Sequence, residues 1–143
     1  MKTGKIIGTA SSFILVLLVL MSMGSCKKKA VKPDVAGMLK TGTWKVKTVT
    51  VNGVDQLSLF TGFSLSYSAT SFSATNGAPV WPATGTWTLN SEGTIITRGD
   101  GLAVNIDNIT STSLGLSLSW GKTTLGGGRS TSVAGSHVFT FGL

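Results

Sequence analysis

The sequence of 143 residues contains one cysteine, one histidine and five acidic residues. A single cysteine excludes a disulfide bond within the chain. One histidine and one cysteine cannot supply the ligands of a zinc site, and the five acids lack the spacing of a calcium-binding loop. The acids also form no pair of neighbouring carboxylates suited to acid–base catalysis. We therefore expect no metal, no cofactor and no enzymatic activity.

The chain also lacks a basic surface once its N-terminal segment is set aside. The whole sequence carries a formal net charge of +7, but six of its twelve basic residues lie within residues 1–32. Residues 34–143 hold six basic and five acidic residues, a formal charge of +1. Such a balance leaves no basic stripe to bind a phosphate backbone. We expect no nucleic-acid partner.

Three short motifs that suggest activity lack their required context. The stretch "WGKTT" (120–124) is no phosphate-binding loop, because position 116 is Leu rather than the leading Gly. The tripeptide "RGD" (98–100) falls in a Gly-Asp-Gly turn, and the turn alone explains its composition. The sequence contains no nucleophile-elbow motif whose serine His137 could activate, and His137 shares a strand face with two phenylalanines. It is therefore predicted to be an interior residue.

The first 25 residues have the composition of a secretory signal peptide. Lys2 and Lys5 make the start basic, residues 13–20 form an unbroken apolar run, and Gly24 and Ser25 follow. The apolar run is too short for a membrane-spanning helix, which needs about 20 residues.

The next residues resemble a lipoprotein attachment site. "MGSC" (23–26) is similar to a bacterial lipobox, with Met23 at a position where Leu is usual, and the resemblance implies that Cys26 carries the lipid. Residues 26–36 are predicted to be the lipidated cysteine and a flexible basic tether, and residues 37–143 to be one domain. The lysines after the cysteine favour an outer-membrane lipoprotein that faces the periplasm, because surface-exported lipoproteins of Bacteroides-type bacteria tend to carry acids there.

The domain alternates in polarity with a period of two, and no stretch shows a convincing helical period. Residues 113–120, for example, place leucines and Trp120 on one face and glycine or serines on the other. Eight short strands at regular spacing predict an all-β fold, an antiparallel up-and-down barrel whose closure removes aggregation-prone edges. The predicted strands are 42–51, 62–68, 70–75, 85–90, 94–98, 102–107, 113–120 and 135–143.

Turn residues separate these strands. Asn52-Gly53 and Asn76-Gly77 are pairs suited to type I′ hairpins. Pro79 and Pro82 keep residues 78–85 out of any central strand. Residues 55–60 are predicted to form a short helix or an irregular lid.

The tetrapeptide Thr-Gly-Thr-Trp occurs twice, at 41–44 and 84–87. The flanking sequences differ, and two copies are too few for a repeat array, which needs about three. We interpret the tetrapeptide as one structural device used twice. Gly lets the chain turn into a strand, and we predict that Trp44 and Trp87 enter the same barrel from different walls.

The order of these segments resembles the lipocalin-like lipoproteins of Bacteroides-type bacteria. Gly42-Thr43-Trp44 matches the Gly-X-Trp pattern of a lipocalin first strand, and the resemblance covers nearly all of residues 37–143. It implies a lipocalin-like barrel. Lipocalins often pack an Arg near the end of the last strand against the first-strand Trp, whereas residues 130–143 hold no Arg. Related calycin-type barrels therefore stay open as alternatives.

An eight-stranded barrel is just wide enough to be filled by side chains or to hold one small ligand. Two functions follow: a membrane-anchored protein that binds a small hydrophobic ligand without chemistry, or a filled barrel that acts as an interaction or inhibitor module for an envelope protein. The predicted rim comprises Trp81, which either is exposed or plugs the barrel end, with Lys122 and Arg129. The predicted ligand lining is Trp44, Phe63, Tyr67, Phe72, Trp87, Trp120, His137 and Phe139, of which His137 is the main polar contact.

Overall fold

The computed structural model describes residues 32–121 and 134–143. The predicted signal peptide, Cys26, Lys122 and Arg129 lie outside these residues. Residues 33–143 make up one compact unit. The elements are α2 (Val35–Leu39), β1 (Thr43–Val51), β2 (Val54–Asp55), the 3₁₀ helix η1 (Leu57–Phe60), β3 (Ser64–Tyr67), β4 (Ser71–Thr75), β5 (Thr84–Leu89), β6 (Ile95–Arg98), β7 (Ala103–Ile109), β8 (Ser113–Trp120) and β9 (Gly135–Gly142).

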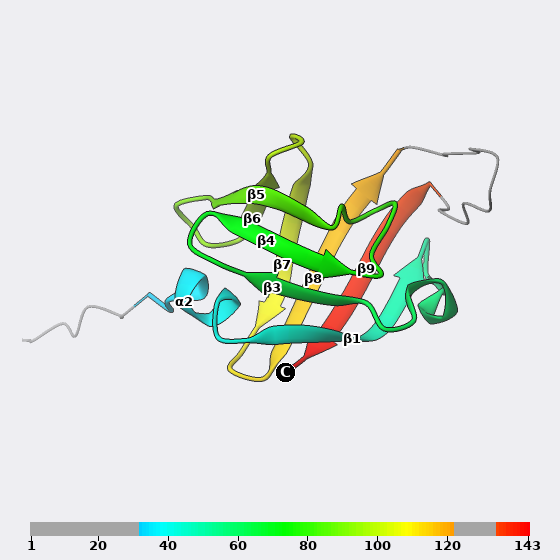
Figure 1. Ribbon diagram of the computed structural model, residues 1–143, viewed down its shortest axis with the longest axis horizontal. Coiled ribbons are helices and arrows are strands. Elements are labelled where there is room, and N and C mark those ends of the chain that lie inside the picture. Colours follow the sequence, from blue (N-terminus) through cyan, green and yellow to red (C-terminus); the bar gives the residue numbers. More distant parts are fainter. Residues whose placement is uncertain (1–31, 122–133) are drawn as a thin grey trace, which may run out of the picture. The chain divides into compact units, whose positions relative to one another are not determined.

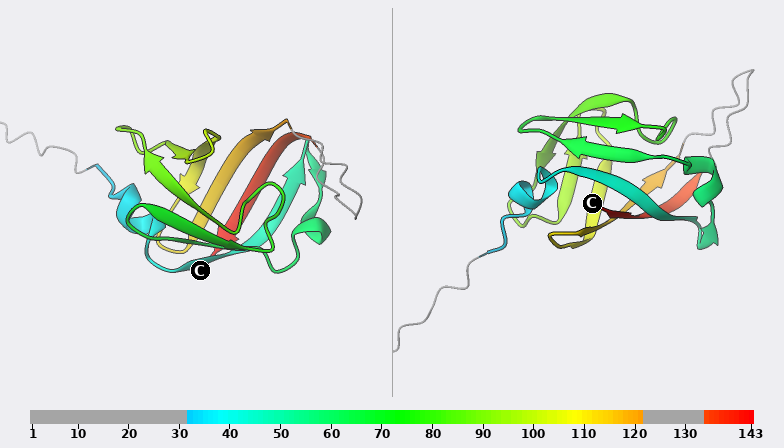
Figure 2. Two further views of the ribbon diagram at one scale, coloured as in Figure 1. Left: turned by 45° about the horizontal axis from the view of Figure 1, so that its top comes forward. Right: turned by 60° about the horizontal axis from the view of Figure 1, so that its bottom comes forward.

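The strands form a closed antiparallel barrel (Figure 1). Within the described residues one sheet has the order β2-β1-β3-β4-β5-β6-β7-β8-β9, and β1 also pairs with β9. That pairing closes eight strands into an up-and-down barrel, and β2 is one extra strand beside β1. Both views of Figure 2 show β3 to β5 lying across from the long β8 and β9. The predicted all-β barrel and each of its eight strands are confirmed.

Two turns with the same Asn-Gly composition behave differently. Asn52 and Gly53 both have positive φ, +50° and +80°, as the predicted type I′ turn between β1 and β2 requires. The prediction for Asn76-Gly77 is wrong, because these residues begin a long loop that runs to β5. Gly77 is needed there for space: a Cβ atom would lie 2.6 Å from Phe63 Cε2 and 2.6 Å from Trp81 Cβ.

The regular alternation of β1 is interrupted by a bulge between Val46 and Thr48 in its pairing with β9. Trp44 points inward before the bulge, whereas Val49 and Val51 are the buried residues after it. A bulge inserts one extra residue into a strand and so shifts every later side chain to the other face. The bulge explains why the clean pattern of this strand is lost halfway along the sequence.

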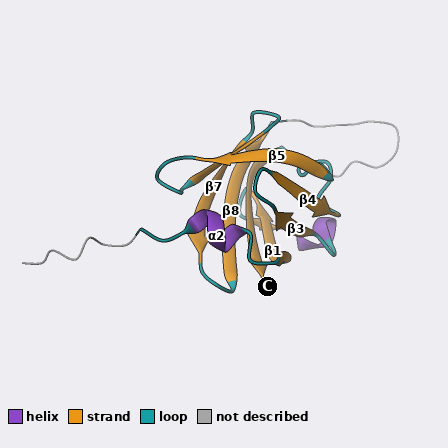
Figure 3. Cartoon of the chain, turned by 60° about the vertical axis from the view of Figure 1, so that its left-hand side comes forward, coloured by secondary structure: helices purple, strands orange, loops and turns teal. Residues whose placement is uncertain are grey.

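Short helices cover the two ends of the barrel. At the end where β1 begins, which we call the α2 end, α2 places Leu39 in the core, fully buried (Figure 3). At the opposite end, which we call the η1 end, η1 contributes the buried Phe60. The prediction of a short helix within residues 55–60 is confirmed.

The folded unit begins earlier than the predicted boundary at residue 37. Asp34 caps α2, its side chain accepting a hydrogen bond from the Gly37 amide at 2.8 Å, and Val35 and Ala36 pack against the core. These residues belong to the domain because their apolar side chains help to cover the α2 end.

Candidate functional site

The eight residues predicted to line a ligand site all point into the barrel. None exposes more than 9% of its surface, and Trp44 and Phe139 are fully buried. Their rings lie against one another: the ring centroids of Phe63 and Phe139 are 5.6 Å apart, and those of Tyr67 and Trp87 are 5.2 Å apart. A ligand-sized space beside these rings, even an enclosed one, would leave part of them uncovered. The predicted lining residues therefore pack as a core.

The two tryptophans of the repeated tetrapeptide both belong to that core, as predicted. Trp44 Nε1 donates to the Leu39 carbonyl at 2.9 Å, in a fully buried contact that ties β1 to α2. Trp87 Nε1 donates to the carbonyls of Ser68 and Ser71, both at 3.2 Å, and Trp87 is 7% exposed. The two indole nitrogens thus donate to different segments: that of Trp44 to the end of α2, and that of Trp87 to the turn between β3 and β4.

The prediction that Trp81 forms an exposed contact on the rim is wrong. Trp81 is fully buried, and its ring packs edge-on against Phe72 with centroids 5.7 Å apart. Its backbone amide donates to the Gly77 carbonyl at 2.8 Å, which folds the loop back into the barrel. The alternative interpretation, in which Trp81 plugs one end of the barrel, agrees with its buried position.

Arg98 is an interior residue that the sequence analysis missed. It is 2% exposed, at the end of β6, and its guanidinium carbon lies 5.0 Å from the centre of the Trp81 ring. Its Nη1 donates to the buried Val80 carbonyl at 2.7 Å, and its other nitrogens pair with Asp100. The signal in the sequence was alternation, because Ile96 and Arg98 occupy the same face of "TIITR".

The ion pair sets the charge of Asp100. Burial alone would raise its pKa, but hydrogen bonds from Arg98 and from the Leu102 amide hold the pKa below its usual range. The Asp100 side chain is 49% exposed while that of Arg98 is 1% exposed. The "RGD" tripeptide therefore joins an inward arginine to an outward carboxylate across a tight turn.

His137 and Tyr67 carry polar atoms inside the barrel. His137 is 1% exposed, stacks on Phe139 with ring centroids 5.9 Å apart, and has Nδ1 3.1 Å from the Gly135 carbonyl. Burial lowers the pKa of His137 and raises that of Tyr67. The buried atoms His137 Nε2, Tyr67 Oη and Trp81 Nε1 have no hydrogen-bond partner among the described residues.

A shallow depression lies on the outer side of β3, β4 and β5, and the sequence analysis did not foresee it. Its volume is about 260 Å³, just below the range of about 300–1,000 Å³ that is usual for small-molecule pockets. Most of the residues that line it are serines or threonines, and none of them is charged. The lining residues are Ser66, Tyr67, Ser68, Ser71, Phe72, Ser73 and Thr84.

The described residues contain no group of three or more histidine, cysteine or acidic side chains placed to hold a metal ion. Nor do residues 32–121 and 134–143 include a helix long and apolar enough to cross a membrane. The remaining predicted site residues, Cys26, Lys122 and Arg129, lie outside this part of the chain.

The geometry defines a class: a closed eight-stranded antiparallel barrel with an aromatic core and one additional strand. Comparison with known proteins does not narrow the class, because no family model, no curated protein and no solved structure matches the chain.

Proposed function

We propose that the protein is a non-enzymatic lipoprotein of the outer membrane, anchored through Cys26 and facing the periplasm, with a lipocalin-like barrel that acts through its outer surface. The barrel would bind another envelope protein and so serve as an interaction module. The observation that carries this proposal is the covered interior. All eight predicted lining residues are at most 9% exposed, and six of them have rings in contact with other rings, namely Phe63, Tyr67, Phe72, Trp87, His137 and Phe139.

The packing favours the interaction module over a ligand carrier. Five aromatic rings, those of Phe60, Phe63, Trp81, Phe139 and Phe141, form a connected cluster with centroid distances between 5.2 and 6.4 Å. Such close aromatic pairs stabilise a core by about 0.5–1.5 kcal/mol each beyond their area. A ligand would have to separate them, so binding at the interior would work against the stability of the fold.

The sequence order supports the anchor. A basic start, an apolar run, small residues and then Cys26 follow one another in the order of a lipoprotein signal. The compact unit starts at Pro33, so only six residues separate Cys26 from it. A short link of this kind would present the barrel close to the membrane surface.

The environment of His137 supports a function without chemistry. Its ring is buried between Phe60 and Phe139, and its Nδ1 contacts the Gly135 carbonyl. A catalytic histidine needs a reacting group within hydrogen-bond reach and access for a substrate. Neither a serine hydroxyl nor a carboxylate is bonded to this ring among the described residues.

Carriage of a small ligand is the second candidate, and one observation favours it. The unpartnered atoms Tyr67 Oη, Trp81 Nε1 and His137 Nε2 lie inside the barrel. Buried polar atoms without partners cost free energy, and a bound small molecule or ordered water would satisfy them.

Native mass spectrometry of the untagged protein, purified from its host, separates the two candidates. We expect the mass of the lipidated chain alone. A small molecule bound in equal proportion would overturn the filled-barrel proposal and favour carriage. His137→Phe is the matched variant, because loss of that ligand from it would place the ligand beside the imidazole.

Two further measurements test the anchor and the outer surface. Metabolic labelling with palmitate should mark the wild-type protein and not Cys26→Ala; labelling that persists would contradict the anchor. A photo-crosslinking residue at the exposed position Ser73 should capture one envelope protein in living cells. The same residue placed at the buried Leu116 should capture none, and equal capture at both positions would contradict binding through the outer face.

A further inference from the structure

Three exposed lysines gather where the folded chain begins. Lys40 follows α2, and Lys45 and Lys47 lie on the first half of β1. None of the three side chains has a hydrogen-bond or ion-pair partner among residues 32–121 and 134–143. Their charges are therefore available to a partner outside the chain. We call these three residues the lysine face.

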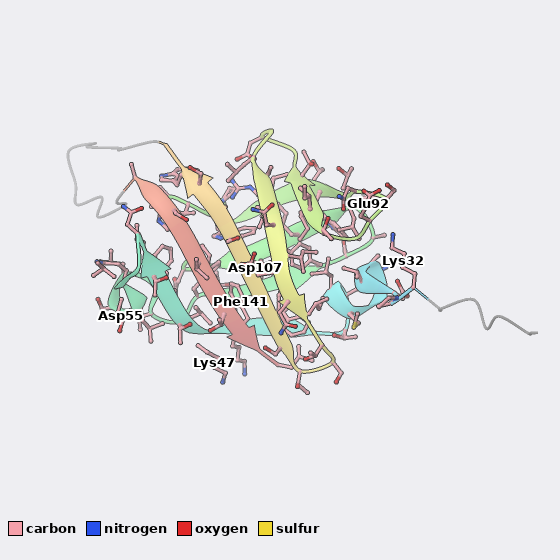
Figure 4. All side chains as sticks on the ribbon, turned by 180° about the vertical axis from the view of Figure 1, so that it is seen from behind. Lys32, Lys47, Asp55, Glu92, Asp107 and Phe141 are labelled. Carbon is pink, nitrogen blue, oxygen red and sulfur yellow. The ribbon has the colours of Figure 1, made fainter. Side chains whose placement is uncertain are left out.

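Lys45 and Lys47 lie on the same, outer side of β1, because residues two positions apart in a strand share a face. The irregularity between Val46 and Thr48 falls at Lys47, and the alternation changes only after it. Lys47 lies across the end of β9: a Cβ atom added to Gly142 would be 2.8 Å from Lys47 Cε. Figure 4 shows Lys47 projecting away from the barrel beside this end of β9.

No acidic side chain among the described residues forms an ion pair with the lysine face. Asp34 and Glu92 lie beside α2, because Asp34 caps it and Gly93, next to Glu92, lies against Val35. Asp107 accepts a hydrogen bond from Ser117 on β8. Asp55 lies on β2, which pairs with the far end of β1. Asp100 is paired with Arg98. The three lysines of the lysine face thus lie beside α2 and on the half of β1 next to the α2 end.

The chain enters the barrel at the same place. The compact unit starts at Pro33, immediately before α2, and Figure 3 shows α2 beside the start of β1. Six residues lie between Cys26 and Pro33, so the two are seven residue steps apart, and seven extended steps span at most about 25 Å. A lipid on Cys26 would therefore hold the α2 end, and with it the lysine face, within about 25 Å of the bilayer surface.

We propose that the lysine face docks on a membrane surface that contains anionic lipids, so that the barrel lies with its α2 end toward the headgroups and its η1 end away from them. This inference rests on the lipid anchor of the proposed function. Each lysine close to an anionic surface strengthens association by about fivefold. Removal of two lysines should then lower the ratio of docked to undocked barrels by about 25-fold.

Single cysteines report the orientation of the full lipidated chain on vesicles. The only native cysteine is Cys26, whose thiol is consumed by the lipid, so a new cysteine is the one free thiol. Thr43→Cys places a fluorophore beside the lysine face. Val54→Cys, at a residue that is 60% exposed, places it at the far end of β1. Spin-labelled headgroups quench a fluorophore that lies close to them.

On vesicles with about one-third phosphatidylglycerol we expect stronger quenching at position 43 than at position 54, and we expect about 1 M salt to remove the difference. Lys45→Gln with Lys47→Gln should remove it too, while Lys45→Arg with Lys47→Arg should keep it. Equal quenching at both positions of the wild-type barrel would overturn the docking. Flotation with the vesicles tests the anchor separately. A protein that does not float with them would contradict the attachment of a lipid to Cys26.

Discussion

The two ends of the barrel are closed by different chemistry. At the α2 end, the indole nitrogen of Trp44 is bonded to the Leu39 carbonyl, and the short helix is capped by Asp34. At the η1 end, Trp81 Nε1 and His137 Nε2 are buried without a hydrogen-bond partner in the part of the chain that the structure describes. A charged residue, Arg98, is buried against the Trp81 ring.

This difference indicates what stabilises each end. Satisfied hydrogen bonds and apolar packing hold the α2 end, and neither depends on ionisation in the neutral pH range. The η1 end keeps its fold while it accommodates a buried guanidinium and a buried imidazole, which cost free energy unless they are paired or neutral. We therefore expect the α2 end to respond mainly to loss of volume and the η1 end to respond to changes of charge.

The largest effect is expected from Trp44→Ala at the α2 end. The substitution removes a fully buried ring and leaves the Leu39 carbonyl without its donor, so it should lower the free energy of unfolding by about 3–5 kcal/mol. Urea denaturation followed by circular dichroism would measure the change.

Trp44→Phe and Trp87→Ala serve as the matched controls. Trp44→Phe keeps most of the ring and should cost less than Trp44→Ala. Trp87→Ala should also cost less, because Trp87 is 7% exposed and Trp44 is not. An equal or larger loss for Trp87→Ala would contradict the view that the first copy of the tetrapeptide closes the barrel end.

The next largest effect is expected from Arg98→Ala at the η1 end. It leaves the buried Val80 carbonyl unpaired and removes the contact with the Trp81 ring. The free energy of unfolding should fall by about 2–3 kcal/mol. Thermal unfolding at neutral pH would show the loss as a lower midpoint.

The partner carboxylate should matter less. Asp100 is about half exposed, and Asn keeps one acceptor oxygen beside the buried guanidinium, so Asp100→Asn should cost about 1–2 kcal/mol, less than Arg98→Ala. Arg98→Met, which keeps the length of the side chain, should recover part of the loss through packing. If Asp100→Asn destabilises the barrel as strongly as Arg98→Ala, the ion pair rather than the inward guanidinium holds this end.

A pH-dependent effect is expected from His137. Burial holds its pKa below the ordinary value of about 6.5. Above that pH the imidazole is neutral in both states, whereas below it the unfolded chain binds a proton that the folded chain resists. Stability should thus be complete above pH ~6.5 and fall as the pH drops, by at most about 1.4 kcal/mol per pH unit, until the folded-state pKa is reached.

His137→Phe isolates this term, because it keeps a ring against Phe139 and removes the titrating group. The difference between wild type and variant, measured by urea denaturation between pH ~5 and ~7.5, should shrink or change sign toward neutral pH and favour the variant in acid. A constant difference across this range would show that the histidine does not titrate on unfolding.

The strands could be predicted from the sequence because each buries alternate side chains, and alternation is a local pattern. Two features of the fold could not be predicted from that pattern. The bulge at Lys47 breaks the alternation of β1 for a reason that lies in its pairing with β9. The loop that carries Trp81 contains two prolines and resembles an exposed connection, yet Gly77 lets it fold back against Phe63.

The residues that face the barrel interior could be predicted from the sequence, but whether they fill that interior could not. Alternation correctly places Phe63, Tyr67 and Phe139 inside, but whether interior rings surround a space or fill it depends on distances across the barrel. Arg98 was missed because a charged residue at a strand end is usually exposed. It is buried here because Asp100, two residues along the same turn, and the Val80 carbonyl, from a different segment, satisfy its donors. The contact with Val80 cannot be seen in any single stretch of sequence.

The smallest effect is expected from Asp34→Ala, which removes the cap of α2. The side chain accepts a hydrogen bond from the Gly37 amide, and loss of such a cap costs about 1 kcal/mol. The helix has only five residues, so its position depends mainly on the packing of Leu39 and Val35. We expect a lower thermal midpoint with unchanged strand content by circular dichroism, and Asp34→Ser, which keeps a capping oxygen, should restore the midpoint. If Asp34→Ala has no effect, packing alone holds α2 in place, and the α2 end would owe its stability to apolar contacts without help from its capped helix.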